Sequence, residues 1–364
     1  MMKKNTILVV DDFLPQFDRH AGGKTIFSFI KTFLNMGFSV KFSPFYASSF
    51  EEPYYSVLQN MGVEVISGDM IGNYIADNYP KIRCIFISRP EVASGFMIKA
   101  IRNLGIKVLY YGQDLHTLRM EREKDFSKDS TDEEIEKMRI LEKSIIEGVD
   151  KAYFPSIFEE NYIREKWHLN NVSTVPAWAY EKNSIGMHNV FEDSSGLIFV
   201  GSSVHAPNFD GLTWFFDKVW PKILQKLPDI PLHLVGFDCA KGQEDVMDGN
   251  VIFERFLSEQ ELDALYAKTK ISIAPLRYGA GIKGKVVDAV YHQVPVVTTN
   301  VGAEGLDTSL NCLAIAQNED DFVDKIVEIY TNKDQWKKMI ENSDTFIERY
   351  FSMAALKKVF EKDI

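Results

Sequence analysis

Short, uninterrupted apolar runs that alternate with helical patterns constrain the fold of this chain more than any other feature. The first run, 7–10, leads through a loop and Gly22-Gly23 into apolar residues at helical spacing between 26 and 34. Further runs follow at 38–42, 62–66, 84–87, 106–111 and 151–154. A continuous apolar strand is typical of a parallel sheet, because helices cover both of its faces. The alternation therefore predicts a doubly wound α/β domain.

A second series of the same kind begins after residue 195, with strands expected at 197–201, 231–236, 270–275 and 295–299. Residues 179–195 lack periodicity, and Asn, Ser, Gly and Asp are frequent there, which is typical of a linker. We expect two Rossmann-like domains, residues 1–178 and 196–340, that face each other across a ligand-binding cleft. Helices at 341–364 could pack back on the N-terminal domain.

Two capping boxes and a charge-rich stretch add local detail. Thr131 with Glu134, and Ser258 with Glu261, have the spacing that caps a helix N-terminus. Helices are therefore expected to begin directly after Thr131 and Ser258. The charged helix within 121–150 is interpreted as a solvated surface.

Charge and cysteine content exclude several classes of protein. The net charge is −11, of which residues 1–180 carry −2 and residues 181–364 carry −9. Nucleic-acid-binding proteins present a basic surface, so no nucleic-acid partner is expected. The three cysteines are scattered, which argues for a reducing compartment and against a disulfide framework or a zinc cluster. With neither a signal-peptide pattern nor an apolar run of ~18–20 residues, a cytoplasmic protein is expected.

Ligands of doubly wound sheets bind at the carboxyl ends of the strands, and two loops of the first half stand out there. Gly22-Gly23-Lys24 could let an anion approach backbone N–H groups, although a tight turn explains the glycines as well. The G-x-G-x-x-G and Walker patterns are both missing from this loop. Asp114 and His116 follow the fifth strand and could position or polarise a sugar hydroxyl. A purely structural histidine is the open alternative.

Two loops of the second half are also candidates. Gly201 and Ser202 follow a strand, and Asn208 is expected to be the N-cap of the next helix. The loop at 275–289 combines three glycines with three cations at the junction of strand and helix. Backbone N–H groups, the helix dipole and fixed cations together predict a diphosphate site. A solvated helix face is the alternative interpretation.

Three segments, 199–211, 274–285 and 295–306, resemble the C-terminal domain of group 1 (family 4) glycosyltransferases. The resemblance implies the GT-B architecture, with an acceptor-binding N-terminal domain and a donor-binding C-terminal domain. It also implies transfer with retention, no metal and no other cofactor. By the same resemblance, Arg277 and Lys283 bind the donor diphosphate, and Asp288 binds the nucleotide ribose.

The chain departs from the family pattern at two places. Relatives carry two acidic residues separated by seven others; Asp288 matches the second, but Ala280 stands at the first. The usual Arg/Lys pair after the first strand of the C-terminal domain is replaced by Ser202, Ser203 and His205. Lys283 and Lys285 could supply the missing charge.

We therefore expect a metal-independent hexosyl- or deoxyhexosyltransferase. It would move a sugar from a nucleoside diphosphate donor to a hydroxyl of a saccharide or lipid-linked saccharide. Its expected role is in surface polysaccharide or glycoconjugate synthesis. Peripheral membrane association through the N-terminal domain would suit such an acceptor. The expected catalytic residues are His116, Asp114, Arg277 and Lys283. The expected donor-binding residues are Gly201, Ser202, Arg277, Gly279, Gly281, Ile282, Lys283, Lys285 and Asp288. The expected acceptor-facing or phosphate-facing loop is Gly22, Gly23 and Lys24.

Two alternatives stay open. A sugar-nucleotide epimerase of the GT-B type would share the fold and the donor site but need no acceptor. A non-catalytic nucleotide-sugar-binding partner subunit is favoured by the two departures from the family pattern. A nicotinamide-dependent dehydrogenase is disfavoured, because the glycine fingerprint is missing.

Overall fold

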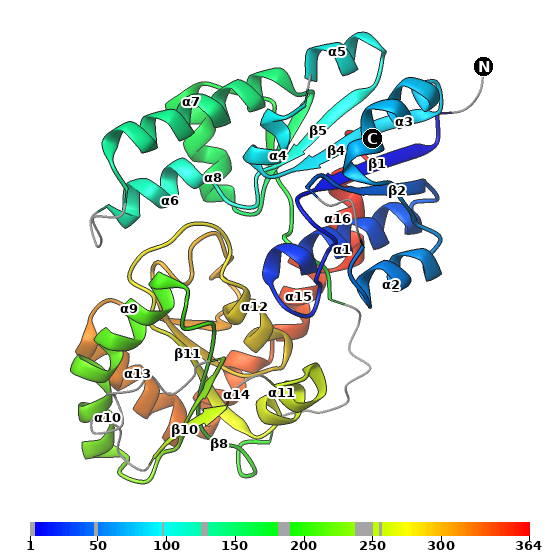
Figure 1. Cartoon of the computed structure of the whole chain (residues 1–364). Helices are drawn as coiled ribbons and strands as arrows, with labels where there is room; N and C mark the ends of the chain where they lie inside the picture. Colours follow the sequence, from blue (N-terminus) through cyan, green and yellow to red (C-terminus); the bar gives the residue numbers. More distant parts are fainter. Residues whose placement is uncertain are drawn as a thin grey trace. The chain divides into compact units, whose positions relative to one another are not determined.

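The computed structural model describes residues 4–46, 50–96, 98–124, 130–180, 190–236, 250–254 and 257–364. The chain divides into two compact units (Figure 1). Unit 1 comprises Met1–Glu181 together with Phe351–Ile364, and unit 2 comprises Lys182–Tyr350. Each unit is built on one parallel sheet with helices packed against it. The doubly wound fold class expected for each half is thereby confirmed.

The sheet of unit 1 has seven strands in the order β3-β2-β1-β4-β5-β6-β7. Their bounds are β1 Thr6–Asp11, β2 Ser39–Pro44, β3 Glu64–Val65, β4 Ile82–Ser88, β5 Lys107–Tyr111, β6 Lys151–Phe154 and β7 Val172–Thr174. Successive residues of β1 enter different cores. Leu8 and Val10 belong to one apolar cluster, and Ile7 and Val9 belong to the other. Both faces of the sheet are therefore covered, which explains why the apolar run is continuous rather than alternating.

The helices of unit 1 are α1 Ala21–Asn35, α2 Tyr54–Asn60, α3 Ile71–Asn78, α4 Pro90–Ser94, α5 Ile98–Asn103, α6 His116–Glu123, α7 Asp132–Gly148, α8 Ile157–Tyr162 and α16 Met353–Phe360. A 3₁₀ turn, Gly68–Met70, precedes α3, and a π-helical turn, Ile163–Trp167, follows α8. Two separate helices, α4 and α5, join β4 to β5. The last helix of the chain, α16, packs on α1, where the ring of Phe360 lies 5.2 Å from Phe29 and 4.9 Å from Phe33.

The sheet of unit 2 has six strands in the order β10-β9-β8-β11-β12-β13. Their bounds are β8 Ser195–Val200, β9 Leu232–Val235, β10 Val251–Glu254, β11 Thr269–Ala274, β12 Val296–Thr299 and β13 Leu313–Ala316. Sequence reasoning missed β7, β10 and β13 as strands. All three are edge strands in which half or more of the residues are not fully buried, so they need less apolar sequence than the central strands.

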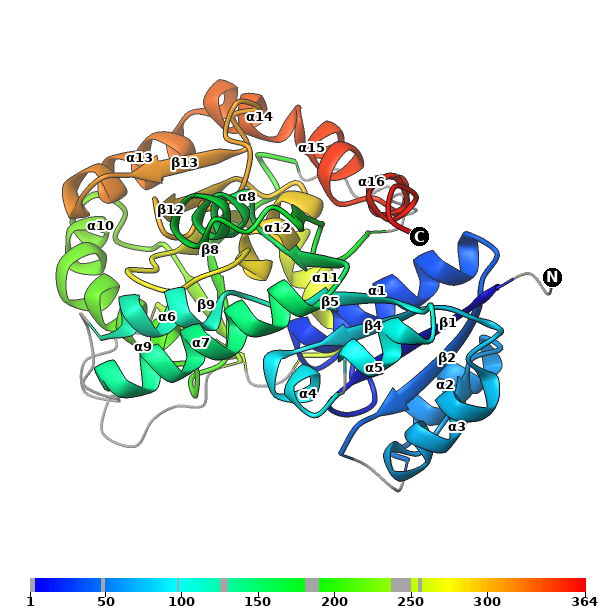
Figure 2. The ribbon, with the colours of Figure 1, turned by 90° about the horizontal axis from the view of Figure 1, so that it is seen from above.

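The helices of unit 2 are α9 Ala206–Trp214, α10 Trp220–Lys226, α11 Glu259–Tyr266, α12 Gly284–Tyr291, α13 Glu319–Thr331, α14 Lys333–Ile340 and α15 Ser343–Tyr350. A π-helical turn, Phe215–Val219, joins α9 to α10. The helices α13, α14 and α15 follow one another along one side of the unit (Figure 2). No helix within the described ranges is both long enough and apolar enough to cross a membrane.

Both predicted capping boxes are confirmed. The Thr131 hydroxyl accepts the backbone N–H of Glu134 and the Glu134 carboxylate accepts the N–H of Thr131, and Ser258 and Glu261 do the same. Most of the predicted linker, residues 181–189, lies outside the described residues. Directly before residue 181, the N–H of Tyr180 donates to the carbonyl of Phe351 at 2.8 Å. The two chain segments at the boundary of unit 1 therefore pair with each other.

Candidate functional site

The loop between β11 and α12 is the centre of the candidate donor site in unit 2. Gly279 and Gly281 have φ values of 132° and 69°, which a residue with a side chain rarely adopts. Lys283 occupies the N-cap position of α12, and its Nζ donates to the carbonyls of Ala280 at 3.0 Å and Gly281 at 2.6 Å. The ammonium group of Lys283 therefore fixes the turn that the two glycines make possible.

Arg277, at the start of the same loop, is held by a carboxylate from α9. Its Nε donates to Oδ2 of Asp210 at 2.8 Å, and its Nη2 donates to Oδ1 of the same carboxylate. Such bidentate pairs fix the plane of the guanidinium group. The contact forms because β8, which precedes α9, is the neighbour of β11 in the sheet. Sequence reasoning missed Asp210; its only signal was its position within 199–211, one of the segments that carry the resemblance.

The expectation that Asn208 caps α9 is wrong. The N-cap is His205, because Pro207 is suited to the first turn of a helix and the helix therefore begins earlier. Asn208 lies inside the first turn instead, where its Oδ1 accepts a hydrogen bond from Nζ of Lys285 at 2.5 Å. Its Nδ2 donates to the carbonyl oxygen of Ser202 at 2.9 Å. Asn208 thus links the two loops that were predicted to bind the donor.

The remaining predicted donor residues lie at different depths around these loops. Gly201 and Ile282 are half-buried, and Ser202 is exposed. A Cβ on Gly201 would lie 2.8 Å from Nζ of Lys285, so the structure brings Gly201 and Lys285 together. Asp288 is half-buried in α12, one turn before His292, whose N–H donates to the Asp288 carbonyl at 3.1 Å.

In unit 1, Gly22 and Gly23 lie in the first turn of α1, and neighbouring backbone leaves no room for a side chain at Gly23. A Cβ on Gly23 would lie 2.5 Å from the carbonyl oxygen of Gln16. A Cβ on Gly22 would lie 2.9 Å from the guanidinium group of Arg89. Close packing against backbone explains Gly23, whereas Gly22 borders the ends of the Arg89 and Gln113 side chains.

Lys24, the third residue predicted in this loop, packs against aromatic rings. Its Nζ lies 4.6 Å from the ring centroid of Tyr180 and 5.3 Å from that of Trp178. At these distances a cation is attracted to the electron-rich face of the ring. Lys24 therefore links α1 to the chain segment that leaves unit 1, a contact that sequence periodicity does not reveal.

Asp114, in the loop after β5, contacts His116, the first residue of α6. Nε2 of His116 is 3.0 Å from a carboxylate oxygen of Asp114, and Nδ1 is 3.8 Å from Glu91. Arg119 contacts the other oxygen of Asp114 at 3.3 Å. Burial opposes protonation of the imidazole, but the hydrogen bond and charge of Asp114 outweigh it and raise the pKa of His116 above 6.5. The imidazole of His116 therefore keeps its proton to a higher pH than an isolated histidine does.

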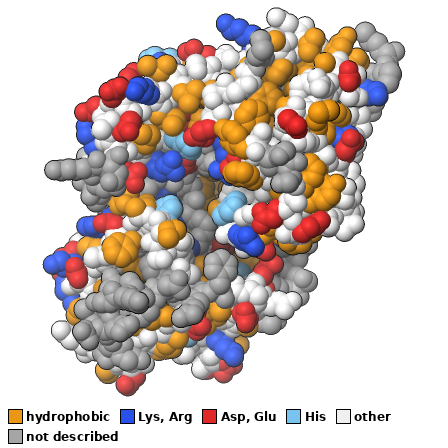
Figure 3. Space-filling model, viewed as in Figure 1, with side chains coloured by type: hydrophobic (Ala, Val, Ile, Leu, Met, Phe, Trp, Pro, Cys, Tyr) orange, Lys and Arg blue, Asp and Glu red, His pale blue; other side chains and the backbone are white. Residues whose placement is uncertain are grey.

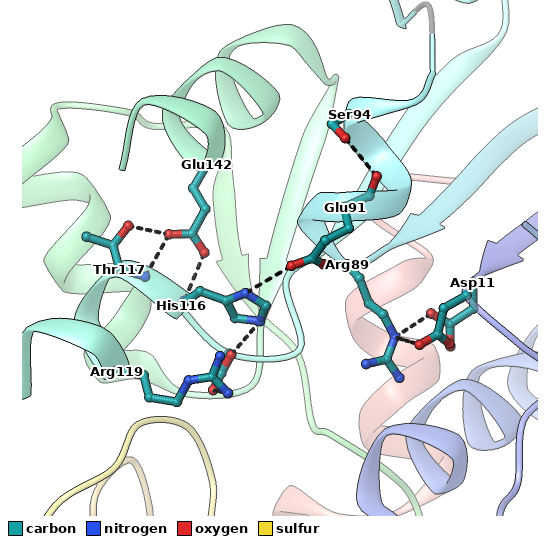
Figure 4. Close-up of polar contacts among 10 residues, drawn as sticks. Asp11, Arg89, Glu91, Ser94, His116, Thr117, Arg119 and Glu142 are labelled. Carbon is teal, nitrogen blue, oxygen red and sulfur yellow. Dashed lines mark hydrogen bonds and ion pairs between the residues drawn. The ribbon is translucent and has the colours of Figure 1, made fainter. Parts of the chain in front are cut away.

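Two buried glutamates hold the backbone around His116 in place. Glu142 of α7 accepts the N–H groups of His116 at 2.9 Å and Thr117 at 3.0 Å, together with the Thr117 hydroxyl at 2.6 Å (Figure 4). Glu159 of α8 accepts the N–H of Leu115 at 2.7 Å. Both glutamates are 0% exposed, so the interpretation of the charge-rich helix as a solvated surface is wrong at Glu142. This carboxylate satisfies the N-terminus of α6.

Sequence reasoning also missed a polar cluster at the ends of β1 and β4. Nε of Arg89 lies 2.9 Å from Asp11 and 3.1 Å from Asp12 (Figure 4). Burial raises the pKa of Asp11 to about 6, against the opposing charge of Arg89. Arg89 and Gln113, which follow β4 and β5, have φ values of 73° and 64°. Left-handed backbone at non-glycine residues is concentrated at functional sites, and a signal was available, since each residue lies two positions after the end of a predicted strand.

The described cysteines are buried and free. Burial raises the pKa of Cys84 to about 12 and that of Cys312 to about 11, so both are thiols at neutral pH. Cys239 lies outside the described residues. Within the described ranges, no group of three or more His, Cys, Asp or Glu side chains is arranged to hold a metal ion.

Comparisons with known proteins agree with the segments singled out above. Residues 194–332 match the family model described as "Glycosyl transferases group 1". An uncharacterized 44.6 kDa protein in the cps region of Klebsiella pneumoniae is 30% identical over 231 residues. That match covers 61% of this chain and 58% of the relative, so it spans less than two thirds of the relative's length.

Several solved structures share the fold over the whole chain. Sucrose-phosphate synthase from Thermosynechococcus elongatus has a TM-score of 0.72 at 13% identity and covers 98% of this chain and 97% of its own. TarM has a TM-score of 0.74 at 9% identity, with 100% and 98% covered. HepE of Anabaena, solved with UDP and glucose, has a TM-score of 0.69 at 12% identity, with 98% of both chains covered. The expected resemblance is therefore confirmed: residues 194–332 are similar to group 1 glycosyltransferases, and the chain has the GT-B fold with two Rossmann-like units.

Proposed function

We propose that the protein transfers a sugar from a nucleoside diphosphate sugar to a hydroxyl of a saccharide or lipid-linked saccharide acceptor. The observation that carries the proposal is the basic loop after β11. In this loop, Arg277 and Lys283 flank two glycines with left-handed backbone, and the loop lies inside the segment that matches group 1 glycosyltransferases. Cations and exposed N–H groups at the carboxyl end of a strand are suited to a diphosphate.

Charge stabilisation is the main catalytic contribution of this loop. When the bond between the sugar and the diphosphate breaks, negative charge develops on the leaving diphosphate. Arg277 and Lys283 are fixed by Asp210 and by loop carbonyls, so they stabilise that charge with little reorganisation. In unit 1, His116 with Asp114 positions a sugar hydroxyl or holds its proton. We further propose transfer with retention, which the anomeric configuration of the product tests by NMR.

The relatives support the substrate class. HepE has been solved with UDP, with UDP and glucose, and with UDP-glucose, and a TarM mutant of S. aureus with UDP, α-GlcNAc-glycerol and fondaparinux. The relative from Klebsiella pneumoniae lies in a cps region. We therefore propose a role in surface polysaccharide synthesis, with a hexose or deoxyhexose as the transferred sugar.

A panel of nucleotide sugars, each with and without saccharide acceptors, tests the proposal. Sugar transfer to an acceptor is expected for at least one donor, with slow hydrolysis of the same donor when no acceptor is present. Conversion of the donor to an epimer or to free nucleotide without any acceptor dependence would instead indicate an epimerase. Nucleotide binding without turnover of any donor would indicate a non-catalytic subunit.

Transfer is expected to be independent of divalent metal, because Arg277 and Lys283 supply the charge that a metal supplies in other transferases. The rate in excess EDTA should equal the rate in untreated buffer, and added Mg²⁺ or Mn²⁺ should not raise it. Loss of activity in EDTA that Mg²⁺ or Mn²⁺ restores would contradict this part of the proposal.

We also propose a cytoplasmic protein that associates peripherally with a membrane through unit 1. On the face drawn in Figure 3, hydrophobic side chains gather over the part of unit 1 that holds β1 and β2. Phe13, which follows β1, and Tyr46, which follows β2, are 55% and 56% exposed, and their rings lie 6.3 Å apart. Co-sedimentation with vesicles of anionic phospholipid is expected to fall when both are replaced by serine, and equal sedimentation of this variant would contradict the proposal.

A further inference from the structure

Lys285 and Asn208 connect two helix N-termini that follow neighbouring strands. Asn208 lies in the first turn of α9 after β8, and Lys285 lies in the first turn of α12 after β11. Nζ of Lys285 donates to Oδ1 of Asn208 at 2.5 Å. The ammonium form of Lys285 can only donate in this contact, so it orients the amide of Asn208 with Nδ2 toward the carbonyl of Ser202, 2.9 Å away.

Both side chains lie directly over Gly201. A Cβ on Gly201 would lie 2.7 Å from Nδ2 of Asn208, 2.8 Å from Nζ of Lys285 and 3.0 Å from the ring of Phe199. Nζ of Lys285 also lies 4.2 Å from the centroid of that ring. Because Gly201 has no side chain, Asn208 and Lys285 can pack against it. The two side chains thereby hold the turn at 201–202 in place.

The charge of Lys285 is poorly compensated in this position. Burial, and then the nearby charge of Lys283, lower the pKa of Lys285 to about 7. The groups that face it from β8 and α9 are the Phe199 ring and the Asn208 amide, and the Asp210 carboxylate of α9 binds Arg277 instead. Among the described residues, no carboxylate forms an ion pair with Lys285. An anion bound at the neighbouring loop would therefore favour its protonated form.

We propose that Lys285 is a positioning residue that acts through Asn208 to set the Gly201–Ser202 turn for the phosphates of the donor. The proposal rests on the proposed function and changes the role expected for Lys285, from a direct donor ligand to a residue that acts through another. Its physical basis is that a carbonyl engaged by Asn208 cannot turn its partial negative charge toward a phosphate. Protonation of Lys285 strengthens its bond to Asn208 and so stabilises the turn when an anion is present.

The pair is tested first in the ligand-free protein, by NMR of the Asn208 side-chain amide and the Gly201 backbone amide. Both resonances are expected to shift with pH, with a midpoint near 7, because Lys285 titrates next to them. The shift should vanish in Lys285→Met and persist in Lys222→Met, which removes a lysine of an exposed ion pair on α10 in the same unit. Identical titrations in wild type and Lys285→Met would contradict the contact between Lys285 and Asn208.

The link to the donor is tested by calorimetry with UDP, and with GDP and ADP in parallel. At pH 7.5, Lys285→Met and Asn208→Ala are each expected to raise the Kd about tenfold. Because residues in contact are coupled, the double variant should raise the Kd no further than the single variant that binds more weakly. Gly201→Ala, which displaces both side chains but removes neither, should weaken binding to a similar extent. Additive losses, or a loss confined to Lys285→Met, would show that Lys285 binds the donor directly.

Proton linkage gives a readout that a merely structural role would not change. Between pH 7 and 9, wild type is expected to take up protons on binding, since the diphosphate raises the pKa of Lys285; below pH 7 the lysine is already charged. Heats measured in buffers of different ionisation enthalpy report this uptake, which Lys285→Met should abolish, and persistent uptake would contradict the assignment. If wild type binds none of the three nucleotides, the proposed donor class fails, while the NMR titration still decides on the pair.

Discussion

Replacing His116 by alanine is expected to lower kcat by ~10²-fold or more, the lower range for a positioned acid–base group, while leaving UDP affinity and Tm close to wild type. The fold should survive because the backbone of this segment is held by Glu142, which accepts the main-chain N–H groups of residues 116 and 117. Within the described ranges, the imidazole contacts the side chains of Asp114 and Glu91. Parallel measurements of melting, UDP binding and transfer rate decide the outcome.

His233→Ala serves as the matched control, since His233 is also a partly buried histidine with a carboxylate partner, Glu254 at 3.3 Å. It should keep kcat. A His116→Ala protein that melts early yet transfers sugar at the normal rate when folded would show that His116 is structural.

The pH profile adds a sign to this prediction. Only a neutral imidazole accepts a proton, so activity should fall as pH drops through the pKa of His116, which lies above 6.5 because Asp114 favours the charged form. Asp114→Asn should move that acid limb to lower pH.

Lys283→Ala is expected to weaken UDP binding by ~1.5–3 kcal/mol, the range for hydrogen bonds to charged groups, which corresponds to a Kd about 10- to 150-fold higher. Two effects act together. The variant loses a cation beside the proposed diphosphate, and it loses the bonds from Nζ to the carbonyls of Ala280 and Gly281 that hold the turn. Calorimetry measures the change directly.

Two aspartate-to-asparagine variants, one in α9 and one in the helical turn after it, accompany this prediction. Asp210→Asn removes the negative charge that Arg277 contacts, so it should act in the opposite direction and tighten UDP binding by a factor of about two to ten. Asp217→Asn removes the same charge from an exposed position in the helical turn after α9 and should leave the Kd unchanged. An unchanged UDP affinity in Lys283→Ala would exclude the loop as the diphosphate site.

Much of the secondary structure was predictable, because its causes are local. A continuous apolar run such as 7–10 forms a strand covered on both faces, and Thr131 with Glu134 closes a capping box within four residues. The edge strands β7, β10 and β13 were missed because half or more of their residues are not fully buried, and such strands need less apolar sequence.

The candidate site was predictable in outline only. The sequence located the loops at the ends of β5, β8 and β11, because parallel strands place ligand-binding loops at their carboxyl ends. It did not indicate which side chains meet there. Asn208 has the residue type of an N-cap and yet binds Lys285, and Glu142 lies in a charged helix and yet is buried beneath His116.

The sequence by itself therefore determined the alternation of strands and helices, the two doubly wound units and the positions of the candidate loops, since these follow from hydrophobic periodicity, helix capping and the direction of parallel strands. Only the tertiary structure decided the partners: Asp210 with Arg277, Asn208 with Lys285, and Arg89 with Asp11. The physical reason is strand order. Each of these pairs joins residues 67 to 78 positions apart, and they meet because β8 lies beside β11 and β1 lies beside β4.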